Sequence, residues 1–458
     1  MWIPEITVSE GPRYLALARA ISEAIENGDL QPGARLPPQR ELARELKMTV
    51  GTVGRAYNIA KERQLLSSQV GRGTFVRELS MNEGTVKYFP ERQAGTIDLA
   101  CFTQAIPGLA DSISNALIGI AHRSSLLPLQ KYPPAAGFLP HRAAGAAWIS
   151  RTGLQVAPES VLVCNGAQQA LMLAMTAMTR SGETVLIEEL AFSGIKALGS
   201  LLERRLESVE IDEFGIVPAS LEKKIAQTGA LLLYMQPTCH NPTGAVMPEA
   251  RRREIADILQ RHGMLAIEDD VAIGGLKDRP LPVAHFAPDN VLYLNGLSKV
   301  LSPALRIAYL ACPPQNFEHM SNMLHALTLA NTPIMAELAT TLINDGTADI
   351  LTQRNLETLA ARHKMMSEYL GDTPHSSHPA GFFIWVKLPP HWTSKTFHEA
   401  ARRVGISVVP ADNFTIHPDG PNAVRISVSP GMKPELVKKG IDMLLQLMAE
   451  RHAVQMTV

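Results

Sequence analysis

The chain has little of what secreted and membrane-bound proteins need. Its 458 residues include only 4 cysteines, at positions 101, 164, 239 and 312, and no two of them form a CxxC pair. Cysteines scattered in this way indicate reduced thiols in the cytoplasm rather than a disulfide framework or a metal site. No apolar run approaches the ~20 residues of a membrane span. The first ten residues also lack the basic and apolar stretches of a signal peptide. We therefore expect a cytoplasmic protein with no membrane contact and no bound metal.

The chain also has almost no net charge. The formal value is −1, which taken over the whole chain does not favour a nucleic-acid partner. Residues 1–80 differ, because 11 Lys and Arg side chains there stand against 9 Asp and Glu, an excess of two. An excess this small becomes informative only if the same segment has the fold of a DNA-binding module.

The first 80 residues have the pattern of a winged helix-turn-helix. Apolar residues recur at helical spacing in three segments, and Pro38 and Thr49 mark the starts of the second and third. Two short strands around a glycine turn follow them and predict the wing. In such a module the third helix enters the major groove, so double-stranded operator DNA is the expected partner. The predicted elements are helices over residues 14–25 and 39–46, a third helix from Thr49 through Ala60, and strands at 65–66 and 74–76.

Six positions in this module are expected to contact DNA. The arginines among them would bind phosphates or base edges, and each phosphate contact adds about one unit to the salt dependence of binding. Any one of these arginines has the alternative of being a solvated helix face. The six are Arg40, Thr49, Thr52, Arg55, Arg72 and Gly73.

These residues stand in an order that resembles the GntR family of bacterial regulators. An arginine that is common in the family just after the helix cap is Val50 here, with Gly51 next. We therefore expect base readout to shift to Thr52 and Arg55. The matching positions are Pro32-Gly33, Leu36-Pro37, Arg40, Leu42-Ala43, Leu46, Thr49, Thr52-Val53, Ala56-Tyr57 and Gly71-Arg72-Gly73-Thr74-Phe75-Val76.

The rest of the chain has a different organisation. Periodicity fails over residues 79–96, which predicts a linker between a DNA-binding domain at 1–78 and a second domain at 97–458. In the second domain apolar runs alternate with helical segments, as in an α/β fold with a parallel sheet and crossover helices. We expect a large part at about 135–325 and a small part made of 97–134 and 326–458. The predicted buried strands are 161–164, 184–187, 230–234, 265–267 and 291–294.

Polar residues follow these strands at their carboxyl ends, where α/β sheets bind ligands. They fit one cofactor, pyridoxal 5'-phosphate (PLP). Lys299 would form the Schiff base, for which its amine must be partly deprotonated, and Asp269 would keep the pyridine nitrogen protonated. Asn241 would bond the ring hydroxyl and Arg306 the phosphate, which the helix opening at Gly166-Ala167-Gln168 would cradle with its N–H groups.

With these motifs, nearly the whole chain resembles the MocR subfamily of GntR regulators, which join a winged helix-turn-helix to a fold type I aminotransferase-like domain. The resemblance implies that Phe192 stacks on the PLP ring and that Tyr132 reaches the phosphate of a neighbouring subunit, which requires a domain-swapped homodimer. It also implies that Arg425 binds the α-carboxylate of an amino-acid ligand, although a structural salt bridge is an alternative. The matching segments are Tyr132-Pro133-Pro134-Ala135-Ala136-Gly137, Asn165-Gly166-Ala167-Gln168-Gln169-Ala170-Leu171, Asn241-Pro242-Thr243-Gly244, Glu268-Asp269-Asp270, Ser298-Lys299 with Arg306, and Ala423-Val424-Arg425-Ile426-Ser427.

The chain departs from the family's pattern at two positions. Val271-Ala272 stands where relatives usually have a tyrosine that donates to the ring hydroxyl, and Gly296 stands where a hydroxyl residue is common. Both changes should loosen the hold on PLP. Outside the motifs, His240 is expected to be a satisfied turn histidine, and Arg251-Arg252-Arg253 a solvated helix start or, alternatively, a second DNA-contacting patch.

The predicted function is a PLP-dependent, DNA-binding transcriptional regulator. It would sense an amino acid, an amine or PLP itself through the aminotransferase-like domain. The alternative is an active PLP-dependent aminotransferase with a DNA-binding appendage, because Lys299, Asp269 and Arg425 permit at least a half-transamination.

Overall fold

The computed structural model describes residues 2–4, 12–26, 29–31, 33–62, 65–69, 73–76, 95–122, 126–271, 279–417 and 420–450. The chain divides into two compact units, Met1–Val86 and Lys87–Val458, and each is described here by itself. In these ranges no helix is long and apolar enough to cross a bilayer.

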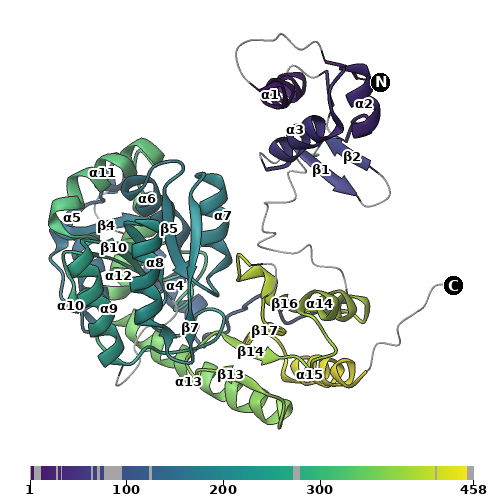
Figure 1. The fold of residues 1–458 in the computed structure, drawn as a ribbon. Coiled ribbons are helices and arrows are strands. Elements are labelled where there is room, and N and C mark those ends of the chain that lie inside the picture. The colour runs from purple at the N-terminus through teal and green to yellow at the C-terminus, as the bar shows by residue number, and fades with distance from the viewer. Residues whose placement is uncertain are drawn as a thin grey trace. The chain divides into compact units, whose positions relative to one another are not determined.

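The first unit is a winged helix-turn-helix, as the sequence predicts (Figure 1). Thr49 caps the third helix, since its Oγ1 accepts from the Thr52 N–H at 3.1 Å. Tyr57 is fully buried and donates its hydroxyl to the Pro37 carbonyl at 2.8 Å, which ties the third helix to the connector before the second. Arg72 lies outside the described residues. The elements are α1 (Arg13–Glu26), α2 (Gln39–Glu45), α3 (Val50–Glu62), β1 (Leu66–Gln69) and β2 (Gly73–Val76).

The second unit is built on a seven-stranded sheet in the order β4-β12-β11-β10-β9-β5-β6. Its strands pair in parallel except β12, which is antiparallel to both of its neighbours. Because the strands run in parallel, the carboxyl ends of β9, β10 and β11 meet at one edge. The strands are β4 (Val161–Cys164), β5 (Thr184–Glu188), β6 (Arg205–Val209), β9 (Leu232–Met235), β10 (Leu265–Asp269), β11 (Val291–Gly296) and β12 (Ala308–Ala311).

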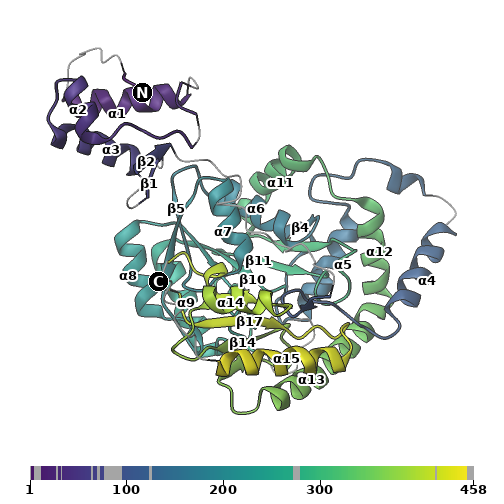
Figure 2. The same ribbon diagram turned by 90° about the vertical axis from the view of Figure 1, so that its right-hand side faces the viewer.

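Helices cover both faces of this sheet (Figures 1 and 2). Successive side chains of one strand enter different cores: Leu233 packs on one face, and Leu232 and Tyr234 pack on the other. Both faces are therefore buried, and the strands read as continuous apolar runs. On the face of Leu233 lie α5 (Leu139–Ser150), α8 (Pro218–Thr228), α9 (Glu249–His262) and α12 (Pro333–Asn344); on the other lie α6 (Ala167–Met178), α7 (Ser193–Leu201) and α11 (Pro314–Thr328).

A smaller antiparallel sheet, β13-β14-β17-β16, carries three helices on one face (Figure 2). Val424 and Ile426 point into the core under those helices, so the intervening Arg425 lies on the opposite face together with Trp385. The strands are β13 (His375–Ser377), β14 (Phe383–Lys387), β16 (Val409–Pro410) and β17 (Ala423–Ser427); the helices are α13 (Thr347–Leu370), α14 (Ser394–Arg403) and α15 (Pro434–Ala449).

The packing of the large and small parts differs from the predicted boundaries. Ile106, Ala116 and Ile120 belong to the core of the seven-stranded sheet, as do α12 and the first turns of α13. Residues 106–120 and 333–351 therefore pack with the large part, whereas the sequence assigned them to the small one. The remaining elements are α4 (Leu109–Ala121), α10 (Val283–Phe286), β3 (Ile97–Asp98) paired with β15 (Ile406–Ser407), β7 (Ile211–Asp212) paired with β8 (Gly215–Ile216), and the 3-10 helices η1 (Leu127–Gln130), η2 (Pro158–Ser160) and η3 (Ala411–Asn413).

Candidate active site and DNA-reading face

Lys299 stands three residues beyond the end of β11, on a loop that two distant amides hold. Gln104 donates its Nε2 to the Lys299 carbonyl at 2.6 Å and to the Ser298 carbonyl at 3.4 Å. Asn355 donates its Nδ2 to the Val300 carbonyl at 2.9 Å. The backbone around the lysine is thus fixed from two sides, which leaves the side chain to move as the chemistry requires.

The Lys299 amine has an apolar and electropositive environment. Its Nζ lies 5.5 Å from the centre of the Phe102 ring and 5.9 Å from that of Phe383. Burial and then the positive charge of Arg425 lower the pKa of Lys299 to about 8; Cys101 opposes this shift, and Arg306 adds a smaller lowering effect. About a tenth of this amine is therefore neutral near pH 7, far more than for an ordinary lysine, and the neutral form is the nucleophile.

Gly166 and Arg306 lie together in a position suited to an anion. Gly166 has φ 90 and precedes α6, and a Cβ added to it would lie 2.7 Å from the guanidinium carbon of Arg306. The Ser298 hydroxyl is buried and has no hydrogen-bond partner among the described residues. Gln168 donates its side-chain Nε2 to the Gly194 carbonyl at 3.3 Å. Helix N–H groups, a guanidinium and a hydroxyl are together the usual donors to a phosphate.

Asp269 is buried at the end of β10, and one of its oxygens accepts two hydrogen bonds. Tyr234 donates its hydroxyl to Oδ2 at 2.7 Å, and Gln236 donates its Nε2 to the same atom at 3.0 Å. Burial raises the pKa of Asp269 to about 6, and the bond from Tyr234 is the largest effect opposing that rise. Neither partner was identified from the sequence. Both lie at the end of the neighbouring strand β9, and parallel pairing is the signal that places them there.

Arg425 joins the smaller sheet to the loop that follows β9. Its Nη1 donates to Asn241 Oδ1 at 2.8 Å, and its guanidinium carbon lies 3.7 Å from the centre of the Phe383 ring and 5.0 Å from that of Phe414. A guanidinium can only donate, so it fixes the Asn241 amide with the oxygen toward Arg425 and leaves the amide N–H groups to face elsewhere. Phe383 contacts both cations, which brings Lys299 and Arg425 to one place.

A second layer of buried charges supports these loops and corrects one prediction. Arg252 is 0% exposed, donates to the Pro237 carbonyl and to Thr238 Oγ1 at 2.9 Å each, and lies 3.8 Å from Glu268. The expectation of a solvated helix start is therefore wrong for Arg252, although Arg253 is exposed. The reason is that the 237–247 loop folds back over the start of α9.

His240 is the satisfied turn histidine that the sequence predicts. Its Nδ1 lies 2.8 Å from Thr243 Oγ1, and its Nε2 lies 2.7 Å from the Leu190 carbonyl and 3.4 Å from Glu188. Burial disfavours the charged imidazole, but the Glu188 carboxylate outweighs burial and raises the pKa of His240. The ring thereby holds the loop in front of Asn241.

Phe192 and Tyr132 lie at the margin of this arrangement. Phe192 immediately precedes α7 and is half-buried against the core on that face of the sheet. Tyr132 is 83% exposed, so its own protomer does not use its ring for packing. Among the described residues no group of three His, Cys, Asp or Glu side chains could hold a metal ion.

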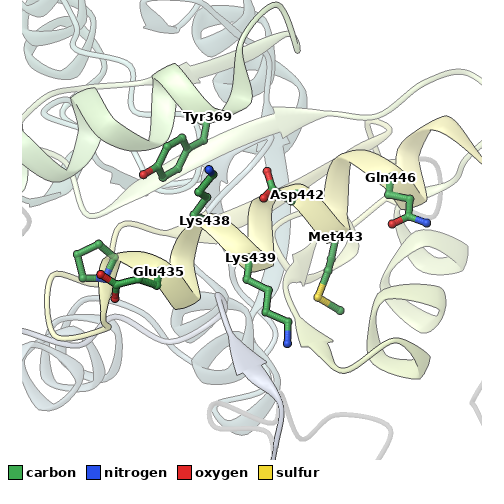
Figure 3. A pocket seen from close by; sticks show the side chains of 8 residues that line it. Tyr369, Glu435, Lys438, Lys439, Asp442, Met443 and Gln446 are labelled. Carbon is green, nitrogen blue, oxygen red and sulfur yellow. The ribbon is translucent and has the colours of Figure 1, made fainter.

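A separate hollow of about 380 Å³ lies on the outer surface of α15 (Figure 3). Lys438 and Lys439 line it, and Lys438 Nζ lies 5.7 Å from the centre of the Tyr369 ring. It contains none of the residues around Lys299. We regard it as an irregularity of the solvent-exposed surface of α15 rather than as a ligand site.

In the first unit the expected DNA contacts point outward. Arg40, Thr49 and Arg55 are exposed, whereas Thr52 is half-buried and its hydroxyl lies 2.8 Å from that of Thr49. Gly73 has φ 123, which a side chain would strain. Five of the six predicted positions are thus described, and they remain predictions as DNA contacts.

Two family models match the chain, one for each unit. Residues 13–76 match "Bacterial regulatory proteins, gntR family", and residues 114–444 match "Aminotransferase class I and II". The HTH-type transcriptional regulator YdeF of Bacillus subtilis is 31% identical over 451 residues, which cover 98% of this chain and 96% of the relative. The HTH-type transcriptional regulator YjiR of Escherichia coli is 24% identical over 91% of this chain and 94% of the relative.

Solved structures resemble the second unit. An α-aminoadipate aminotransferase from Thermus thermophilus, complexed with N-(5'-phosphopyridoxyl)-L-leucine, superposes with a TM-score of 0.70 at 25% identity over 78% of this chain and 92% of that one. A kynurenine aminotransferase from Pyrococcus horikoshii, at 22% identity and a TM-score of 0.72 over 78% and 91%, supports the fold alone. The order of the two matched domains and the full-length similarity to HTH-type regulators lead to one conclusion: the chain belongs to the MocR-type regulators of the GntR family, in which a winged helix-turn-helix precedes an aminotransferase class I and II domain.

Proposed function

We propose that the protein is a transcriptional regulator that binds operator DNA through α3 and the wing and responds to PLP, together with an amino acid or amine, at Lys299. The observation that carries the proposal is the Lys299 amine itself, which aromatic rings and two guanidinium groups hold at a pKa of about 8. A lysine with a purely structural role would not need a lowered pKa. A DNA-binding role would also place the protein in the cytoplasm.

The residues present fit PLP on each side of its ring. Gly166, Arg306 and the unpartnered Ser298 hydroxyl offer donors for the phosphate. Asp269 would face the pyridine nitrogen with the oxygen that Tyr234 and Gln236 leave uncovered, and Asn241 would donate its amide to the ring hydroxyl. When bound, PLP supplies an aldehyde for an amine and an electron-withdrawing ring.

The chain's own contribution is to orient groups and hold protons. Lys299 keeps a neutral amine available because Arg425 and Arg306 disfavour its charged form. Asp269 holds its charge through the Tyr234 bond, and a pyridinium beside it would favour the carboxylate further. The rings of Phe102 and Phe383 give Lys299 an apolar lining, which strengthens each electrostatic contact.

A second copy of the chain is the partner that the second unit requires. α12 packs against α4, η1 and α5, so their exposed apolar side chains lie on neighbouring elements. Exposed apolar side chains on neighbouring elements are typical of a subunit interface. We infer a homodimer in which Tyr132 completes the phosphate site of the other subunit. The exposed residues are Leu117, Ile118, Leu126, Tyr132, Leu139, Leu329 and Ile334.

An active aminotransferase is the alternative, and Arg425 is the observation that favours it. Its bond to Asn241 joins a carboxylate-binding cation to the cofactor site, as turnover of an amino acid would require. In a sensor the same arrangement binds the amino acid and shifts the balance between two states of the protein, with a coupling of typically ~1–3 kcal/mol.

Absorption spectroscopy of the purified full chain with PLP, an amino-acid panel and an excess of a 2-oxo acid tests these alternatives. We expect a band of protein-bound PLP, distinct from the absorption of free PLP, that Lys299→Ala abolishes and that one amino acid shifts without accumulation of product. Sustained product formation would establish the enzyme instead. A wild-type chain that gives the same spectrum as Lys299→Ala would contradict both.

A further inference from the structure

The outward face of α3 carries an apolar side chain that the protein's own core does not use. Val50, the first residue of the helix, is 46% exposed, whereas Val53 and Tyr57 further along are fully buried. The helix therefore packs through one stripe and leaves Val50 to contact something else.

Two glycines lie near Val50: Gly51 in the first turn of α3 and Gly54 in the second. Gly51 is exposed, and the nearest atom to a Cβ added there would be Thr49 Oγ1 at 3.9 Å, so the fold has room for a side chain. At Gly54 the added Cβ would lie 3.2 Å from Gln39 Oε1, the far end of a flexible side chain. Glycine in a helix is less stable than alanine because the unfolded chain has more freedom. Packing within the protein thus does not explain glycine at Gly51, whereas close approach of a ligand to the helix backbone does.

Thr52 already has a hydrogen-bond partner within the protein, although the sequence predicts it as a base-reading residue. Its hydroxyl lies 2.8 Å from Thr49 Oγ1, and its backbone N–H donates to the same atom at 3.1 Å. Both threonines serve the cap of α3. Among the described side chains of α3, Val50, Arg55 and Asn58 are the exposed ones.

We propose that α3 reads thymine in the major groove through the apolar side chain of Val50, and that Gly51 and Gly54 let the helix backbone approach the base edges. The thymine C5-methyl is the apolar group that a base pair presents in that groove, so a valine there selects it. Arg55, five residues further on, lies about 140° round the helix from Val50, so its polar contact would be to a phosphate or to a different base pair. This assignment rests on the proposed DNA-binding function and adds which base the operator must contain.

The test begins with duplexes that the full-length protein selects from a randomised duplex library. In the selected sequence each thymine is then replaced by uracil, which removes one methyl group and nothing else. We expect one position in each half-site at which the replacement weakens binding about four-fold, equivalent to the ~0.8 kcal/mol of one buried methyl. In Val50→Ala the same replacement should have no further effect, because the partner of the methyl is gone. Leu15→Ala, which trims another exposed side chain of the same unit (41% exposed), is the matched control and should bind as wild type.

Gly51→Ala separates a role in DNA approach from a role in folding. We expect it to raise the unfolding temperature of the first unit, measured by calorimetry on the full chain, while it weakens DNA binding ten-fold or more. Equal affinity of the wild type for thymine and uracil duplexes, or unchanged DNA binding by Gly51→Ala, would overturn the assignment and leave DNA binding intact. A library from which no duplex is enriched would overturn the DNA-binding function itself, and the assignment with it.

Discussion

The two units of the molecule present their functional residues in opposite ways. In the winged helix the proposed DNA contacts Arg40, Thr49 and Arg55 are exposed to solvent. In the aminotransferase-like unit Asn241 is 8% exposed and Asp269 is 2% exposed. The half-buried Arg425 holds Asn241, and the buried Tyr234 and Gln236 hold Asp269. The exposed residues would contribute interaction free energy only when DNA binds, and salt screens that contribution. The buried residues take up their orientation when the protein folds, so their pKa values are shifted. Substitution of one of them also lowers the free energy of unfolding.

We expect the largest effect on stability from substitution of Arg252, whose charge is fully buried. Arg252→Met leaves Glu268 without its cationic neighbour, and removal of one partner of a buried pair costs about 3–5 kcal/mol of unfolding free energy. Burial already raises the pKa of Glu268 to about 7, so the loss should be greater at pH 8 than at pH 6, where protonation relieves the uncompensated charge.

Chemical denaturation of the full chain measures this change, and Arg253→Met is the matched control. Its side chain is 57% exposed, so a change within about 0.5 kcal/mol is expected. Equal stability of the two variants would mean that Arg252 is not the support that its burial indicates.

Tyr234→Phe removes the stronger of the two bonds to Asp269 Oδ2. The pKa of Asp269, already raised to about 6, should rise further, so that less of the carboxylate is charged at neutral pH. We expect about ten-fold weaker PLP binding, in line with the ~1.5–3 kcal/mol of a hydrogen bond to a charged group.

Fluorescence titration with PLP should find a larger loss at pH 6 than at pH 8. A loss independent of pH would point to disturbed packing instead. Tyr309→Phe, which alters another buried tyrosine of the same sheet, is the control.

The pH dependence of PLP capture reports the environment of Lys299. Only the neutral amine reacts with an aldehyde, so the capture rate should rise with pH and level off above about 8 rather than above 10. Arg425→Met removes a positive neighbour, so the pKa of Lys299 should rise and the midpoint should move to higher pH. Stopped-flow absorbance at a series of pH values gives both midpoints, and a downward movement in the variant would contradict the electrostatic account.

The smallest effect is expected in the exposed set. Arg55→Ala should weaken DNA binding several-fold and lower the slope of log affinity against log salt by about one, if the arginine binds one phosphate. Arg44, whose side chain is 79% exposed and lies near Glu45, is not an expected DNA contact, so Arg44→Ala should leave the slope unchanged. Fluorescence anisotropy over a salt series distinguishes the two. A base-edge role for Arg55 would appear as a loss on the selected duplex that random duplex does not share.

The sequence predicts those features that depend on local pattern. The cap at Thr49, the strands before Asn241 and Asp269, and the loop position of Lys299 all follow from turn residues and apolar runs within about ten positions. The conclusion that these side chains meet follows from parallel strand order alone.

What the sequence did not predict depends on contacts between distant segments. Gln104 reaches the Lys299 carbonyl across 195 positions, and Asn355 reaches it across 56. The burial of Arg252 depends on a loop packing over its helix, which the periodicity of that helix does not encode. The same holds for residues 106–120, which are separated in the chain from the sheet they pack on.

The most direct test of the account measures operator affinity of the full chain with and without PLP, in the wild type and in Lys299→Ala. If the buried site controls the exposed one, PLP with the effective amino acid should change the affinity of the wild type by at least about five-fold, the lower end of typical allosteric coupling. The variant should not respond. Equal affinities in all four samples would show that the two units work independently and would contradict the account.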